Sequence, residues 1–234
     1  MALYSMPSSA LKKRLVSYRF GDSIYLLHSS FSKVHREHYP DSLSTRLLAT
    51  HGVGKSLPDR LDQLAKMVLE PEYAASRPED DTIVIQLRVG DVLENSGYTA
   101  QQHLVHPPPN ERRNTKRARY LGRYTKPLSY YEQAINKILE NNEISRCVIT
   151  IGGTPPLREI SKEYIDAIVA YVRTRFPDTV IRTKTLCDRC NWRQADSDFA
   201  YLCLAKHMIA SGGGFAQLAR GVNARVKTIL EDGK

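Results

Sequence analysis

The chain has 234 residues, of which 41% are apolar and 25% are charged. These proportions are typical of a folded globular protein, and the length allows one large domain or two small ones. No stretch approaches the roughly 20 apolar residues of a membrane span, and the amino terminus lacks the apolar core of a secretory signal. Four cysteines are too few for a disulfide framework in a chain this long, which predicts a cytoplasmic protein. The net charge of +9 indicates an anionic partner, which could be nucleic acid, a membrane surface or a phosphorylated small molecule.

The first 75 residues are predicted to form a reduced N-terminal α/β unit, followed by a second domain over 76–234. Apolar residues at helical spacing indicate one helix after Asp22, which is a suitable N-cap, and a second helix over 58–70. The second helix is expected to bury four residues, Leu61, Leu64, Ala65 and Val68. The charged, proline-containing stretch 70–81 is expected to be a linker.

From Thr82 onward, short apolar runs alternate with longer helical patterns. Strands are predicted over 82–87, 147–153, 178–185 and 208–211, and helices over 127–142, 159–176, 196–207 and 215–230. Ser129 and Glu132 have the spacing of a capping box at the start of the first of these helices. Strands that alternate with helices of this length predict right-handed crossovers and a parallel sheet. The fold class is therefore expected to be α/β, with a Rossmann-like second domain.

The segment "IQLRVGD" marks the first candidate site, because ligands of parallel sheets bind beyond the carboxyl ends of the strands. Arg88 could bind a diphosphate with its planar guanidinium, and Gly90 would let the backbone turn close to the ligand. The alternative is that Arg88 and Asp91 form an ion pair that stabilises the corner after the strand.

The segment "HMIASGGGFAQLA" marks the second candidate site. A strand that ends in Ser211 and three glycines, and then opens into a helix, presents backbone N–H groups and the positive helix end to an anion. The alternative is a glycine-rich turn that only the geometry of the chain requires. Three successive glycines favour a close approach of the backbone to a ligand.

Taken together and in this order, four segments resemble the GT-B fucosyltransferases, which include α-1,2, α-1,6 and protein O-fucosyltransferase branches. They are "IQLRVGD", at the place of the family's HxRRGD motif, "PLSYYEQAI", "CVITIGG" and "SDFAYLCLAKHMIASGGGF". The resemblance covers residues 82–225, and "RFGDSIYLLHSSFSKV" is similar to the loop and first helix of the family's N-terminal domain. Gln86 stands where the family has His, and Val89 replaces the second Arg of the motif.

The resemblance implies a GT-B-like fold and an inverting, metal-independent transfer of a deoxyhexose, L-fucose first among them, from a GDP-linked donor to a glycan acceptor. Another nucleotide-deoxysugar is an alternative donor, and neither a membrane nor a nucleic acid is an expected partner. Arg88 and Asp91 are the predicted catalytic residues, with Asp22 and Glu94 as other candidates for the general base. The predicted donor-binding residues are Gln86, Arg88, Gly90, Ser211, Gly212, Gly213, Gly214 and Phe215. Gly21, Asp22, Arg123 and Asp198 are further candidates for contacts in the crevice.

Two other segments suggest different functions. "ATHGVGKS", residues 49–56, fits a relaxed phosphate-binding loop, but the strand before it is weak and no later strand ends in a metal-holding Asp. A P-loop kinase or hydrolase is an alternative function on the basis of this pattern. If the pattern is accidental, Lys55 is expected to lie in a loop. The basic stretch 111–126 could be a solvated insertion, a lid over the donor, or a nucleic-acid contact in a non-catalytic binding protein.

The histidines and cysteines give a weak metal signal. Cys187 and Cys190 have the spacing of zinc ligands, but no second pair of this kind follows. His103 and His106 could complete a tetrahedral site with these two cysteines, but the two pairs are far apart in the sequence. Free thiols are expected, and no metal site is predicted.

Overall fold

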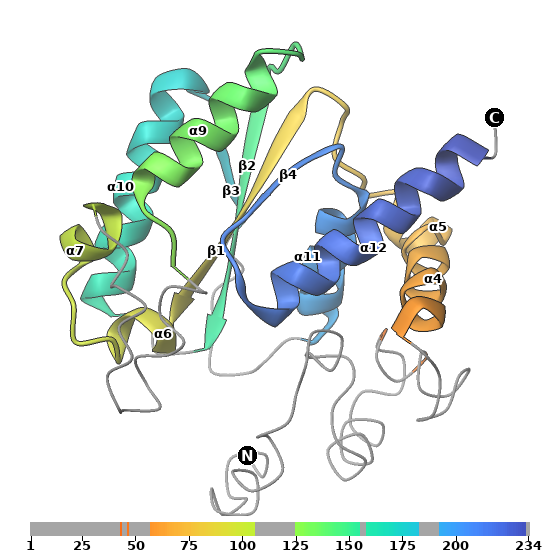
Figure 1. Cartoon of the computed structure of the whole chain (residues 1–234), viewed down its shortest axis with the longest axis horizontal. Helices are drawn as coiled ribbons and strands as arrows, with labels where there is room; N and C mark the ends of the chain where they lie inside the picture. The colour runs from red at the N-terminus through yellow and green to blue at the C-terminus, as the bar shows by residue number, and fades with distance from the viewer. Residues whose placement is uncertain are drawn as a thin grey trace, which may run out of the picture.

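The structure of the protein is a computed structural model, which describes residues 43, 46, 57–105, 125–154, 158–182 and 192–232. Within these ranges the chain is an α/β protein, with a four-stranded parallel sheet and helices on both of its faces (Figure 1). None of the helices in these ranges is long and apolar enough to span a bilayer. The α/β class and the parallel sheet predicted from the sequence are confirmed.

The sheet has the strand order β3-β2-β1-β4. Its strands are β1 (Thr82–Gly90), β2 (Arg146–Thr154), β3 (Val180–Arg182) and β4 (His207–Ala210). β1 pairs with β2 along its whole length and with β4 on its other side, where Gln86 is opposite Ala210. The chain therefore adds three strands in one direction and then crosses back to place β4 beside β1. This reversal is a topological switch point, the place where open parallel sheets bind their ligands.

Helices lie on both faces of the sheet in the described ranges (Figure 1). One face carries α6 (Asp91–Glu94), α7 (Ala100–Val105), α9 (Leu128–Leu139) and α10 (Glu159–Arg175). The other face carries α11 (Trp192–Leu204) and α12 (Gly213–Asp232). Helix α4 (Leu57–Val68) packs against both of them, and α5 (Pro71–Ala74) packs against α11. Two separate hydrophobic cores result, one on each side of the sheet.

Strand β1 contributes very different side chains to the two cores. The α9–α10 face receives Ile83, Ile85, Leu87 and Val89, all completely buried. The other row contains Thr82, Val84, Gln86 and Arg88, because alternate side chains of a strand point to the same face, and Val84 packs into the α11–α12 core. Val84 is the apolar side chain of that row, and the carboxyl half of the row is polar.

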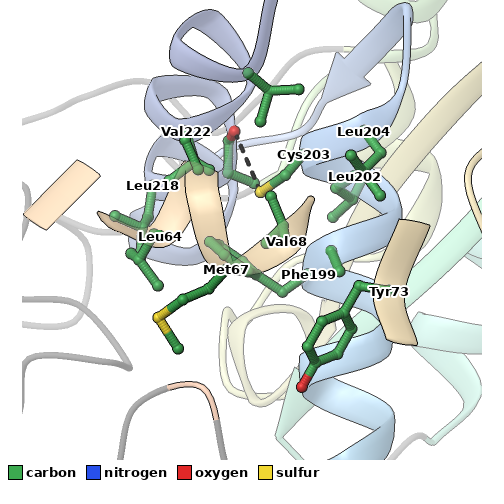
Figure 2. Packing of buried hydrophobic residues seen from close by; sticks show 14 of the residues in the cluster. Leu64, Met67, Val68, Tyr73, Phe199, Leu202, Cys203, Leu204, Leu218 and Val222 are labelled. Atoms are coloured by element: carbon green, nitrogen blue, oxygen red, sulfur yellow. Dashed lines mark hydrogen bonds between the residues drawn. The ribbon is translucent and has the colours of Figure 1, made fainter. Parts of the chain in front are cut away.

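Helix α4 packs against α11 and α12, as Figure 2 shows. The four predicted core residues of this helix, Leu61, Leu64, Ala65 and Val68, are all buried. Cys203 lies in the same core, and its thiol donates a hydrogen bond to the carbonyl of Ala219 over 3.7 Å (Figure 2). The described helices of the predicted N-terminal unit thus share one core with the sheet domain. Of residues 1–56 the structure describes only Leu43 and Arg46, so the predicted division at residue 75 stays a prediction.

Three local predictions were wrong. The stretch 70–81 is not only a linker, because Pro71 starts helix α5 and Tyr73 is buried on the α11–α12 side. Helix α9 begins at Leu128 with Pro127 as N-cap, so Ser129 lies inside the helix and forms no capping box. Strand β1 extends to Gly90, which puts Arg88 within the strand rather than after it.

Candidate functional site

The predicted site residues of β1 and β4 meet at the carboxyl edge of the sheet, at the topological switch point. Ala210 is the last residue of β4 and pairs with Gln86 of β1. Ser211 and Gly212 follow, and helix α12 begins at Gly213. Segments that are more than 120 residues apart in the sequence are joined here by the hydrogen bond between Ser211 and Arg88.

Ser211 links the two strands through both its backbone and its side chain. Its N–H donates to the carbonyl of Gln86 over 3.0 Å, and its hydroxyl donates to Oε1 of Gln86 over 3.0 Å. The same hydroxyl accepts the N–H of Arg88 over 3.0 Å. Ser211 and Gln86 are 1% and 2% exposed, so these contacts are made away from water. The Ser211 hydroxyl therefore links β1 and the end of β4.

Glycines shape the backbone around this link. Gly90, Gly212 and Gly213 have φ angles of 79°, 152° and 87°, a region that other residues rarely adopt. Gly212 and Gly213 turn the chain from β4 directly into the 20-residue helix α12. The N–H groups of its first turn have no acceptor within the helix, and the helix dipole makes this end positive. The turn is therefore suited to bind an anion.

Arg88 brings a fixed positive charge to the same edge. It lies on the α11–α12 face of β1, two residues beyond Gln86, and is partly buried. Its Nη1 donates to the carbonyl of Val89 over 3.0 Å, which keeps the guanidinium close to the strand end. A guanidinium has five N–H donors, which suits it to bind several acceptor atoms at once.

Glu94, a candidate general base, caps a helix. One carboxylate oxygen accepts the N–H groups of Arg158 and Ser161, each over 2.9 Å, at the start of α10. The Ser161 hydroxyl accepts the N–H of Gly90 over 3.1 Å, which ties the last residue of β1 to the same helix. Burial opposes the charge of Glu94, but hydrogen bonds from Ser161 and Arg158 outweigh it and hold its pKa below the usual value. A carboxylate with a lowered pKa is a weaker base.

Three other predicted site residues are described: Asp91, Phe215 and Asp198. Asp91 is the first residue of α6, directly after β1. Phe215 packs edge-to-face on Phe199, with ring centroids 5.6 Å apart, so its side chain contributes to the core. Asp198 lies 3.9 Å from a guanidinium nitrogen of Arg182, near the end of β3.

Tyr130 was not predicted as a site residue but reaches the end of β4. Its hydroxyl donates to the carbonyl of Ala210 over 2.9 Å. The ammonium group of Lys126 lies 5.8 Å from its ring centroid. No local sequence pattern singles out Tyr130, because its contact with Ala210 joins segments 80 residues apart. The adjacent Tyr131 is completely buried.

Several predicted residues lie outside the described ranges. They are Gly21, Asp22, Lys55 with the rest of 49–56, His106, most of the basic stretch 111–126 including Arg123, Cys187 and Cys190. His103 is described and completely buried, with its ring nitrogens 2.9 Å from the Ser96 hydroxyl and 3.3 Å from the Thr125 hydroxyl. Burial lowers its pKa to about 4. Among the described residues, no three His, Cys, Asp or Glu side chains are grouped to hold a metal ion.

A search of protein-family models finds none that matches the chain, and a search of curated proteins finds no significant match. The resemblance to the fucosyltransferases therefore depends on the ordered motifs alone.

Proposed function

We propose that the chain is a GT-B-like glycosyltransferase that uses a nucleotide-sugar donor. The observation that carries this proposal is the arrangement at the switch point, where the glycine turn before α12 and Arg88 lie at one edge of the sheet. A helix end and a guanidinium both favour a negatively charged group such as a diphosphate. The order of the sequence motifs supports a transferase over other diphosphate-binding proteins.

In the proposed reaction, an acceptor hydroxyl attacks the anomeric carbon while the bond from this carbon to the diphosphate oxygen breaks. The acceptor's proton passes to a general base, and the nucleoside diphosphate leaves with an additional negative charge. Arg88 and the N–H groups of the first turn of α12 would stabilise that charge. Asp91 is the remaining candidate base in the described part of the sheet domain, because the carboxylate of Glu94 caps α10.

The sugar is proposed to be a deoxyhexose, with L-fucose as the first candidate, and the acceptor a glycan. These two details depend on the resemblance of the motifs. Gln86 and Val89 depart from the family pattern on the strand itself, so another nucleotide-deoxysugar stays an alternative donor.

Thermal unfolding of the full chain with GDP, UDP or ATP tests the proposal, with each nucleotide measured in EDTA and in Mg²⁺. A ligand that binds only the folded state at about 100 times its Kd stabilises it by roughly 2.7 kcal/mol. We expect GDP or UDP to raise the melting temperature in EDTA. Incubation with GDP-fucose and mixed glycans should then release GDP.

Other outcomes would support different functions. Stabilisation by ATP only when Mg²⁺ is present would favour the P-loop alternative. No stabilisation by any nucleotide, together with salt-dependent binding to single-stranded nucleic acid, would favour a binding protein that uses the basic stretch 111–126.

A further inference from the structure

The peptide group between Ala210 and Ser211 is the last one before the glycine turn, and it is held on two sides. Its N–H, on Ser211, donates to the carbonyl of Gln86 over 3.0 Å. Its C=O, on Ala210, accepts the hydroxyl of Tyr130 over 2.9 Å. The N–H and C=O of a planar trans peptide point in opposite directions, so these contacts reach it from β1 and from α9. Together they fix the rotation of this peptide plane.

The contact with Tyr130 takes the place of a further strand. Strand β4 stands at the end of the order β3-β2-β1-β4, so β1 is its only neighbour in the described sheet. The carbonyl of Ala210 points away from β1, and Ala210 is only 5% exposed. A buried carbonyl without a donor costs about 1–3 kcal/mol, and the hydroxyl of Tyr130 supplies that donor.

The hydroxyl of Tyr130 is itself held in place by the start of α9. The N–H of Tyr130 donates to the carbonyl of Pro127 over 3.1 Å, and its ring packs edge-to-face on Tyr131 with centroids 5.3 Å apart. Just before Pro127, the buried hydroxyl of Tyr164 donates to the carbonyl of Lys126 over 2.6 Å and accepts its N–H over 3.2 Å. The α9–α10 core therefore fixes the position from which Tyr130 reaches β4.

We propose that Tyr130 is a positioning residue, whose hydroxyl orients the Ala210–Ser211 peptide and thereby the N–H groups of the glycine turn that bind the anion. The inference depends on the proposed function, because it concerns the same turn, but it assigns no contact between Tyr130 and the ligand. Gly212 and Gly213 follow this peptide with positive φ angles, and glycine has the greatest backbone freedom of all residues. A turn that is oriented before binding loses less conformational entropy when the anion binds.

Two substitutions on the same helix test this role. Tyr130→Phe removes only the hydroxyl that binds Ala210. The ring keeps its packing on Tyr131 and the position is partly exposed, so this variant should fold. Tyr131→Phe is the matched control, because it removes the hydroxyl of the next residue. That hydroxyl lies 3.4 Å from the hydroxyl of Tyr164, inside the α9–α10 core.

The measurement is calorimetric titration of the full chain with inorganic pyrophosphate and with GDP, both in EDTA. It is made well below the melting temperature of each variant, where all chains are folded. We expect Tyr130→Phe to bind both ligands roughly 3- to 10-fold more weakly with unchanged stoichiometry, as for the loss of one neutral hydrogen bond. A hydroxyl that only stabilised the fold would leave the Kd unchanged under these conditions. Tyr131→Phe should bind with the wild-type Kd.

The outcomes separate this inference from the proposed function. If the wild-type protein binds neither ligand, both are overturned. If it binds both and Tyr130→Phe binds equally tightly, only the positioning role of Tyr130 is overturned. Equal weakening in Tyr130→Phe and Tyr131→Phe would assign the effect to the packing of α9 and contradict that role. Weaker binding of GDP with unchanged binding of pyrophosphate would assign Tyr130 to the nucleoside and contradict it as well.

Discussion

The two faces of strand β1 differ in what they provide to the protein. On the α9–α10 face, four successive side chains are apolar and completely buried along the whole strand. On the α11–α12 face, the row contains Thr82 and Val84 and continues with Gln86 and Arg88, beside the turn that starts α12. One strand thus supports a core with one row of residues and a candidate binding edge with the other. Mutations in the two rows should therefore have separable effects on stability and on binding.

The largest effect on stability is expected from Leu87→Ala. Leu87 is completely buried on the apolar face, and truncation of such a residue costs about 2–5 kcal/mol of the free energy of unfolding. Urea denaturation measures this loss. Titration with GDP at a temperature where the variant is folded should give the wild-type Kd. A folded Leu87→Ala protein that no longer binds GDP would show that the two faces are not separable.

Arg88→Ala should have the reverse effect. We expect a loss of about 2–4 kcal/mol of transition-state stabilisation, as for oxyanion contacts. At ~1.4 kcal/mol per tenfold, turnover would fall about 30- to 1,000-fold. Arg88→Lys should also lose activity, because Lys lacks the planar guanidinium. The melting temperature should change little.

Arg146→Ala is the matched control for Arg88. Arg146 is exposed at the amino end of β2, where it pairs with Glu79 over 2.8 Å. Its loss should leave turnover unchanged. A folded, fully active Arg88→Ala protein, or equal losses in both variants, would refute the assignment of Arg88.

The free energy of unfolding should also depend on pH, because the buried His103 cannot take up a proton as readily as it does in the unfolded chain. Burial lowers the pKa of this residue to about 4, while the unfolded chain takes up the proton near pH 6.5. The free energy of unfolding is therefore highest above pH 6.5, where His103 is neutral in both states, and it falls as the pH is lowered from 6.5 to about 4. The expected loss is roughly 3 kcal/mol, at ~1.4 kcal/mol per pKa unit.

Urea denaturation between pH 7 and pH 4 measures this loss. His103→Gln should be less stable at pH 7, because it changes the contacts with Ser96 and Thr125, but its stability should depend less on pH. The same pH dependence in both proteins would assign the acid sensitivity to other groups.

The smallest effect is expected from Lys55→Ala. The sequence around Lys55 lacks the strand and the metal-holding Asp that a P-loop requires. Turnover should therefore stay within several-fold of the wild-type value. A P-loop lysine stabilises the transferred phosphoryl group, so a loss of several orders of magnitude in a folded variant would revive the hydrolase alternative.

Much of the fold could be predicted because each element has a local signal. The helix over 159–176 and the strand over 147–153 match α10 and β2 to within one residue at each end, since apolar spacing and length determine both. The start of α9 could not be predicted from the Ser129–Glu132 pair, because Pro127 has its φ fixed at a value suited to the cap position. The strand order likewise depends on packing between distant segments.

The sequence predicted which residue types form the candidate site, but not the contacts that these residues make. Arg88 and the glycines stood out, because a cation and positive-φ positions have recognisable sequence patterns. The contact of Glu94 with α10 and that of Tyr130 with Ala210 join segments that are far apart in the chain. No local pattern encodes such contacts. The role of the Ser211 hydroxyl also depends on the register between β1 and β4.

Amide hydrogen exchange, measured on peptides across the whole chain that include residues 207–218, tests most directly whether a diphosphate binds at the glycine turn. The first-turn N–H groups of α12 have no acceptor within the helix and should exchange quickly in the free protein. GDP added in EDTA should slow the exchange of residues 212–216 and leave the amino ends of the strands unchanged. Binding of GDP without protection in this turn, or with protection confined to 49–56, would contradict the proposed site.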